Sequence, residues 1–359
     1  NLDNKIKFMS QVDWDKYHDK YRPEIGDVFF TNIGTIGKTA VVSENFDYLI
    51  HWNIFKIRPL KAKLSPNFLK YYLDYLTGTG YFSDSQKGGT VSFVTKKMMG
   101  SVAIPLPPIP EQQRIVAILD QAFADIEKAR ANAEQNLKNA RELFDNYLLG
   151  ILGHSNKSWM LTTVGDLCVK MEYGSSAKSL NEGDIPVLRM GNLQKGEIDW
   201  GDLKYSADPE EIKKYMLQKG DVLFNRTNSE AHVGKTAVYR GEMPAIFAGY
   251  LIRVHRKKEL LDGDFLNFYL NSSLAMDYGK SVMSRSVNQA NINASKLKAY
   301  PIAVPDIKTQ EKLASTLSEL RDKTEELEEV YDKKVGLLDS LKKSLLQKAF
   351  SGELTKGEG

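Results

Sequence analysis

An internal repeat constrains the fold of this 359-residue chain more than any other feature. Aligning Ile109 with Ile307 gives an offset of 198, at which Gln112 meets Gln310. Upstream blocks match in the same order, with small changes of offset that mark loop insertions: YRPEIGDVFF with YMLQKGDVLF, IGKTAVV with VGKTAVY, and FLKYYL with FLNFYL. Because repeated sequence indicates repeated structure, we predict two copies of one unit, related by pseudo-twofold symmetry.

A long helix is predicted at the end of each copy. The segments that start at Pro105 and Ala303 (PLPPIP and AVPD) precede these helices. Proline holds a segment extended and cannot continue a helix backwards. Beyond them, apolar residues recur in steps of mostly four and three, which is the heptad spacing of a coiled coil. The predicted seam contains Ile115, Leu119, Ala122, Ile126, Ala129, Ala133, Leu137, Ala140, Phe144, Leu148 and Ile151 in the first copy, and Leu313, Leu317, Leu320, Thr324, Leu327, Tyr331, Val335, Leu338, Leu341 and Leu345 in the second.

The predicted fold class is α+β. Two mixed α/β domains are separated by two long helices, which pair as an antiparallel coiled coil because a domain lies between them in sequence. Since Asn1 aligns with Asn192, the first copy lacks a counterpart of residues 159–191, and we expect its domain to be N-terminally incomplete. The expected boundaries are 1–107 for the first domain, 108–153 for the first helix, 154–304 for the second domain and 305–355 for the second helix.

Charge and loop chemistry favour DNA as the partner of the two domains. The domains are mildly basic and the helices mildly acidic. Two polar segments, NRTNSEAHVGK from Asn225 and SRSVNQANINASK from Ser284, carry the side chains that pair with base edges. The alternative is that their Asn and Ser residues only build turns and helix caps. The candidate DNA-binding residues are Arg226, Asn228, Lys235, Arg285, Asn288, Gln289 and Arg189 in the second copy, and Lys38, Lys87 and Thr90 in the first.

Catalytic, metal and cofactor sites are not expected. The two Gly-Lys-Thr triplets lack the earlier glycine of a phosphate-binding loop, and the segments that follow them are typical of strands. No Gly-x-Ser-x-Gly elbow or Asn-Pro-Pro-aromatic tetrapeptide is present, and Cys168 and five scattered histidines offer no zinc spacing. No apolar run has the length of a membrane span, and no signal peptide is visible, so we expect a cytoplasmic location.

Several of these segments together resemble a known family. They are IPLPPIPEQQRIVAILD at the first helix, GDVLF, GKTAVY and SVNQANI in the second domain, and the pattern W-x-L-x-x-x-G-D-L-C at its start. The chain is similar over nearly its whole length to the specificity (S) subunit of type I restriction-modification systems. The Pro-rich entry to a long helix, followed by Glu-Gln-Gln, is the most specific part of this resemblance.

The resemblance implies a complex in which the S, M and R subunits have separate roles. Each target recognition domain would read one half of an asymmetric, bipartite site in double-stranded DNA. The coiled coil would recruit two DNA adenine methyltransferase (M) subunits, restriction/translocase (R) subunits would join them, and the S subunit itself would have no catalysis. The paired helices would then set the unread gap between the half-sites. A free-standing DNA-binding regulator and a coiled-coil scaffold without enzymatic partners are the alternatives.

Overall fold

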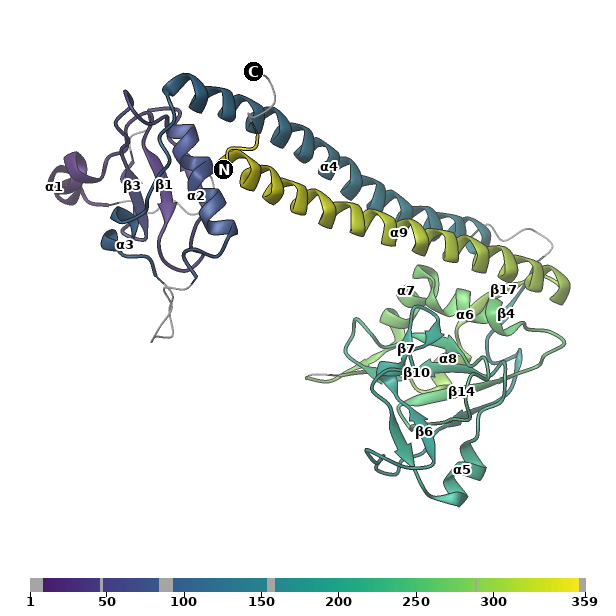
Figure 1. Cartoon of the computed structure of the whole chain (residues 1–359). Helices are drawn as coiled ribbons and strands as arrows, with labels where there is room; N and C mark the ends of the chain where they lie inside the picture. Colours follow the sequence, from purple (N-terminus) through teal and green to yellow (C-terminus); the bar gives the residue numbers. More distant parts are fainter. Residues whose placement is uncertain (1–8, 46–47, 84–92, 154–158, 288, 355–359) are drawn as a thin grey trace. The chain divides into compact units, whose positions relative to one another are not determined.

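The computed structural model describes residues 9–45, 48–83, 93–153, 159–287 and 289–354 (Figure 1). The chain divides into two compact units. Unit 1 contains residues 1–136 and 330–359, and unit 2 contains residues 137–329. Two long helices, α4 (Ile109–Gly153) and α9 (Ile307–Phe350), each contribute one part to unit 1 and one part to unit 2.

A three-stranded antiparallel sheet forms the centre of unit 1. The strand order is β2-β1-β3, and Val28 pairs with both Val41 and Ile57. Val28 and Phe30 are fully buried, because alternate residues of a strand point to the same face. The elements that precede α4 are α1 (Gln11–Tyr21), β1 (Val28–Thr31), β2 (Thr39–Val41), β3 (Ile54–Ile57), α2 (Pro66–Gly78) and α3 (Lys96–Gly100).

Helix α2 lies between this sheet and the long helices of unit 1. Its Leu69 and Leu73 belong to the cluster that contains Val28 and Phe30. Its Phe68 and Tyr71 belong to a second cluster, formed with buried residues of α4 and α9. Because both faces of α2 are buried, the sheet is attached to the long helices through this one helix.

Unit 2 repeats the same core with an additional strand. The strand order is β12-β10-β14-β5, and Val222 pairs with Val238 and Val254, as Val28 does with its two partners. The repeat therefore extends to the strand register. The four strands are β5 (Cys168–Tyr173), β10 (Val222–Asn225), β12 (Thr236–Val238) and β14 (Leu251–Arg256).

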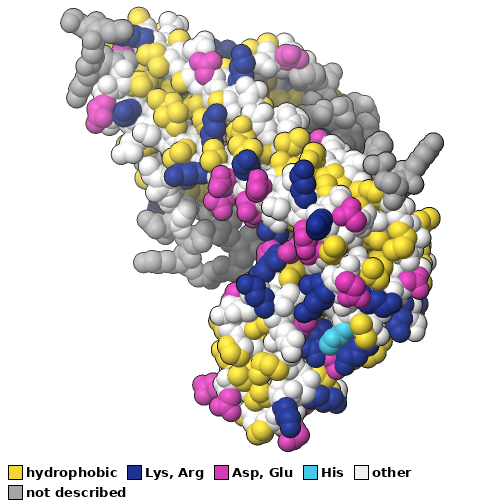
Figure 2. Space-filling model, turned by 90° about the vertical axis from the view of Figure 1, so that its right-hand side faces the viewer, with side chains coloured by type: hydrophobic (Ala, Val, Ile, Leu, Met, Phe, Trp, Pro, Cys, Tyr) yellow, Lys and Arg dark blue, Asp and Glu magenta, His cyan; other side chains and the backbone are white. Residues whose placement is uncertain are grey.

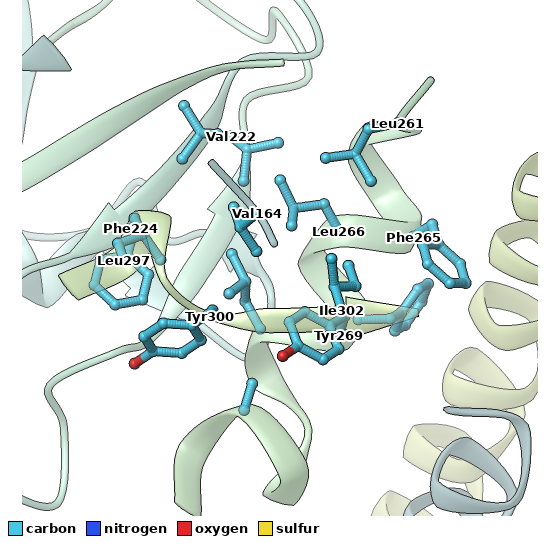
Figure 3. Close-up of a cluster of buried hydrophobic side chains, with 14 of the residues drawn as sticks. Val164, Val222, Phe224, Leu261, Phe265, Leu266, Tyr269, Leu297, Tyr300 and Ile302 are labelled. Atoms are coloured by element: carbon cyan, nitrogen blue, oxygen red, sulfur yellow. The ribbon is translucent and has the colours of Figure 1, made fainter. Parts of the chain in front are cut away.

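The buried cluster of unit 2 is centred on α6 (Gly263–Asn271), the counterpart of α2. In Figure 3, Leu266 and Tyr269 of α6 lie among Val164, Val222 and Ile302, whereas Phe265 points toward the long helices. Strand β17 leads into α9 and pairs with β4, which follows α4. The remaining elements are β4 (Met160–Thr163), β6 (Ile185–Leu188), η1 (Met190–Asn192), β7 (Leu193–Gln194), β8 (Glu197–Ile198), β9 (Lys204–Ser206), α5 (Pro209–Tyr215), β11 (Thr227–Asn228), β13 (Ile246–Phe247), α7 (Ser273–Val282), β15 (Ser284–Arg285), β16 (Ala290–Asn291), α8 (Ala294–Lys298) and β17 (Pro301–Val304).

The Gly-Lys-Thr triplets form the same turn in both units. Gly37 and Gly234 have φ angles of +89° and +96°, a region that side chains with a Cβ rarely adopt. Each glycine leads into the outer strand of its sheet, β2 or β12, so the triplets are hairpin turns.

The long helices pair in antiparallel fashion within each unit, as predicted. In unit 1, Arg130 Nη1 lies 2.5 Å from Asp339 Oδ1, so the early part of α4 meets the late part of α9. In unit 2, Arg141 Nε lies 3.2 Å from Glu328 Oε2, so the late part of α4 meets the early part of α9.

The predicted heptad seam was wrong at two positions. Leu327 and Leu341 are 43% and 47% exposed, whereas Phe123, outside the predicted seam, is buried. The reason lies in the additional partners of the long helices. Phe123 packs on Tyr71 of α2, with 5.4 Å between ring centroids. Near the domain, the apolar residues of a long helix therefore face the domain as well as the other long helix.

A buried glutamine fixes the start of α4. Gln112 is 0% exposed. Its Nε2 donates to the carbonyl oxygens of Lys63 (2.9 Å) and Pro107 (2.8 Å), and its Oε1 accepts from the backbone N–H of Ser65 (2.8 Å). The side chain therefore joins the Pro-rich entry segment to the loop before α2.

Gln310 makes the same three bonds at the start of α9. It is also 0% exposed; its Nε2 donates to Leu260 O (2.9 Å) and Pro305 O (2.8 Å), and its Oε1 accepts from Asp262 N (2.9 Å). The Gln that recurs in the sequence motif therefore fixes the same junction between domain and long helix in both units. We call this set of three hydrogen bonds the glutamine clamp. Only a side-chain amide supplies two donors and one acceptor in this geometry.

Candidate nucleic-acid interface

A small three-stranded sheet in unit 2 brings the two polar segments together. Strand β11 pairs with β16, which pairs with β15, so Thr227 lies opposite Asn291 and Arg285 opposite Ala290. The hairpin β15–β16 extends from the body of the unit as a thin green loop (Figure 1), and Val287 near its tip is 99% exposed. Segments that are about 60 residues apart in sequence thus form one polar surface.

Arg226, at the start of this surface, is held in place by an aromatic ring. Its guanidinium carbon lies 4.7 Å from the ring centroid of Tyr173, and its Nη1 donates to Gly249 O at 3.3 Å. Its buried Nε has no hydrogen-bond partner among the described residues. Stacking and one backbone bond therefore orient the guanidinium of Arg226.

Tyr173 connects Arg226 to the rest of the unit. Its side chain is 40% exposed, and its hydroxyl accepts a hydrogen bond from Ala294 N (3.0 Å) at the start of α8. Beside it on β5, Glu172 Oε2 lies 2.5 Å from Arg253 Nη2 and 2.9 Å from His255 Nε2. Burial alone raises the pKa of Glu172, but the hydrogen bonds from Arg253 and His255 outweigh burial and lower the pKa to about 2. The strand that supports Arg226 is thus fixed by an ionised carboxylate.

Charged residues flank the small sheet. Arg285 Nε donates to Glu230 Oε1 at 2.8 Å, and Lys296 Nζ donates to Ser284 Oγ at 2.7 Å. Elsewhere, on the face that Figure 2 draws, Lys and Arg side chains are interspersed with Asp and Glu. The Arg285–Glu230 pair is exposed, so it contributes little to stability.

The structure places the other predicted residues in several settings. Asn228 lies on β11, where its Oδ1 accepts from Ser229 N (2.8 Å), and Gln289 is exposed on the hairpin. Lys235 instead donates to Gln194 Oε1 (2.8 Å), and Arg189 pairs with Asp202 Oδ2 (3.0 Å). Lys38 is exposed in unit 1, whereas Asn288, Lys87 and Thr90 lie outside the described residues.

The structure brings Arg226, Asn228, Arg285 and Gln289 to one surface, to which Tyr173, not predicted from the sequence, also belongs. The available signal was an aromatic residue directly before Gly174. A Cβ at Gly174 would lie 2.2 Å from Phe247 O, so the backbone passes too closely for any other residue.

The described residues offer neither a metal site nor a reactive thiol. There, no group of three or more His, Cys, Asp and Glu side chains could hold a metal ion. Burial raises the pKa of the Cys168 thiol to about 11, so this thiol stays protonated at neutral pH. In the same part of the chain, no helix has the length and apolar character needed to cross a membrane.

Comparisons with known proteins match the chain to one family. The family model described as "Type I restriction modification DNA specificity domain" matches residues 5–135 and 156–335. The StySPI specificity subunit of Salmonella potsdam is 26% identical over 83% of this chain and 67% of its own length. The putative MjaX specificity subunit of Methanocaldococcus jannaschii is 29% identical over 58% of this chain and 49% of its own length. The chain thus spans between half and two thirds of these relatives.

Two solved structures have the same fold. A chain from a study of complex assembly and conformational transition of the type I R-M system aligns with a TM-score of 0.76 and 21% identity, over 92% of this chain and 83% of that one. The HsdS subunit of Thermoanaerobacter tengcongensis aligns with a TM-score of 0.60 and 22% identity, over 92% and 82%. The match to the family model confirms the family suggested by the sequence resemblance. The chain belongs to the type I restriction-modification DNA specificity family, as a DNA-specificity subunit.

Proposed function

We propose that the chain selects the DNA site of a type I restriction-modification complex by reading two half-sites, one with each unit. The reading domains would span residues 1–107 and 154–304, with residues 108–153 and 305–355 as the helices that join them. The observation that carries this proposal is the repeated scaffold, with the same strand register and the same glutamine clamp in both units. The loops on that scaffold differ, as two readers of different sequences require.

In unit 2 we assign reading to the small sheet. Arg226, oriented on Tyr173, would pair with guanine through its guanidinium, and Asn228 and Gln289 would pair with adenine. Arg285 and Lys296 flank this surface and would contact phosphates, a role that adds affinity without sequence information. We retain Lys38 as the described candidate in unit 1.

We infer that the long helices recruit two adenine methyltransferase subunits, to which restriction/translocase subunits are added. In unit 1, α9 exposes three apolar side chains: Val330 (59%), Leu337 (60%) and Leu341 (47%). Exposed apolar residues at helical spacing are typical of a protein-binding surface. The complex would act on DNA in the cytoplasm. A chain that binds DNA but does not co-purify with a methyltransferase would instead be a free-standing regulator.

The test of site reading is Arg226→Ala. Selection from a random duplex library first identifies the preferred site of the wild-type chain. On that site the variant should lose about 1–3 kcal/mol of binding free energy and discrimination at one base pair. Lys258→Ala, which removes an exposed charge elsewhere on unit 2, is the control. Equal losses for Arg226→Ala on matched and mismatched duplexes would remove Arg226 from the readers.

A further inference from the structure

The tip of the β7–β8 hairpin in unit 2, residues Gln194–Glu197, has an unusual backbone. Lys195 and Gly196 have φ angles of +49° and +84°, the two positive values that a tight two-residue hairpin turn requires. Lysine, unlike glycine, is strained in this region. Such a conformation persists only where neighbouring contacts hold it.

Each residue of the tip contacts a different element of unit 2. Gln194 accepts from Lys235 (2.8 Å), beside β12, and Gly196 O accepts from the buried Nδ2 of Asn267 on α6 (2.9 Å). Lys195 Nζ lies 3.5 Å from Glu325 Oε1 on α9. The tip is therefore attached to the sheet, to α6 and to the long helix at once.

Glu197 makes the strongest of these attachments. Its Oε1 lies 2.9 Å from Arg321 Nη1 on α9 and 3.2 Å from Arg240 Nη2 beyond β12. Arg321 is 18% exposed in its side chain and lies over the ring of Phe268, at 5.7 Å from its centroid. A carboxylate shared by two guanidiniums thus joins the domain to the helix.

The strands on either side of the tip are packed in the domain core, where Leu193 is 0% and Ile198 is 7% exposed. The hairpin is therefore a fixed part of the domain. Beyond it lies a cavity of about 470 Å³, lined among others by Gln194, Lys195, Gly196, Lys235 and Arg321, so the polar contacts of the tip bridge from the domain to α9 beside an unfilled space.

The position of Arg321 holds a different kind of residue in unit 1. At the repeat offset of 198, Phe123 of α4 corresponds to Arg321 of α9. Phe123 is 8% exposed and packs on Tyr71 of α2, as Arg321 lies over Phe268 of α6. The charge that Arg321 offers to Glu197 is therefore particular to unit 2.

We propose that the Gln194–Glu197 tip is a positioning bracket, which fixes the second reading domain on α9 so that its half-site is read at one distance from the first. Glu197 and Arg321 are its main positioning residues and need not touch DNA. This inference rests on the proposed function, because it assigns the tip a role in the gap between the half-sites.

The experiment selects DNA from a library of random duplexes with the full chain and measures the gap between the two half-sites in the recovered sequences. The wild-type chain should recover one gap length. Glu197→Gln and Arg321→Gln should recover the same half-sites with gaps one base pair shorter or longer, and lose about tenfold in discrimination between gaps. Glu182→Gln, an exposed carboxylate elsewhere in unit 2, is the control and should retain the wild-type gap.

A charge exchange separates positioning from simple destabilisation. Lys195→Glu should broaden the gap distribution, and adding Glu325→Lys should narrow it again, because the exposed pair is restored in reverse. An unchanged gap in the Glu197 and Arg321 variants, or an equal loss of affinity at every gap length without broadening, would overturn the bracket. A wild-type chain that recovers no bipartite site would instead overturn the proposed function.

Discussion

Gln112, which forms the glutamine clamp of unit 1, provides a direct test of how the first domain is attached to α4. Gln112→Glu keeps the shape of the side chain and its acceptor for Ser65 N–H, but an ionised carboxylate cannot donate to Lys63 O or Pro107 O. Each acceptor left without a donor costs about 1–3 kcal/mol when buried. We expect the free energy of unfolding to fall by about 3–5 kcal/mol at pH 7, since the new charge is also buried.

The pH dependence of this loss identifies its cause. Burial of a new carboxyl raises its pKa in the folded state above the unfolded value of about 4.3, so the protonated form favours folding. The deficit relative to wild type should therefore be smallest below pH 4, where the protonated carboxyl still leaves one of the two carbonyl oxygens without a donor. It should grow as pH rises through these values and level off above the folded pKa. Gln112→Leu should show a similar loss with no pH dependence.

Urea unfolding followed by circular dichroism, from pH 4 to pH 8, measures these differences. Gln113→Glu introduces the same chemical change at the next residue, which is exposed, and should change the stability by less than about 0.5 kcal/mol. Gln310→Glu repeats the test in unit 2. A Gln112→Glu variant as stable as the Gln113→Glu control, or a pH-independent deficit, would refute the clamp.

Three further results are expected. Ionised Glu172 should add up to about 3 kcal/mol to the free energy of unfolding above pH 4.5, and this contribution should be lost as pH falls toward 2, because the folded pKa is about 2. Urea unfolding of Glu172→Gln at the same pH values should not show this loss. Tyr173→Leu should weaken binding to the selected duplex about tenfold and Tyr173→Phe much less, since only leucine removes the stack under Arg226, and equal losses would argue against stacking. Leu337→Asp should abolish co-purification with the methyltransferase, whereas Lys343→Asp should retain it, and retention by both would exclude this surface.

The repeat and the heptad spacing predicted the scaffold. The heptad spacing is read within one segment, and the repeat is read by matching two segments of the same chain, so neither needs knowledge of the tertiary structure. Matching blocks placed Val28 and Val222 in equivalent strands, and the structure gives them the same register. The seam failed at Leu327 and Leu341, since a spacing rule assumes one partner helix and these helices also pack against a domain.

The candidate site was predictable in composition but not in arrangement. Arg226 and Arg285 were identified from their loops, yet only the pairing of β11, β16 and β15 brings those loops together. Lys235 has the residue type of a phosphate contact, but its side chain meets Gln194, and sequence does not reveal the direction of a side chain at a strand end. Tyr173 was missed because its relation to Arg226 depends on the pairing of β5 with β14, about 80 residues further along the chain.

The partners of the glutamine clamp explain how one scaffold can carry different reading loops. Gln112 and Gln310 bond only to backbone groups, such as Ser65 N and Asp262 N, so the side chains of those loops are free to change. A contact between two side chains, such as Glu197 with Arg321 in unit 2, instead needs both partners, and Phe123 occupies the position of Arg321 in unit 1. Because the glutamine bonds go to backbone groups in both units, the loop side chains of each domain can change while the attachment of the domain to its long helix stays the same.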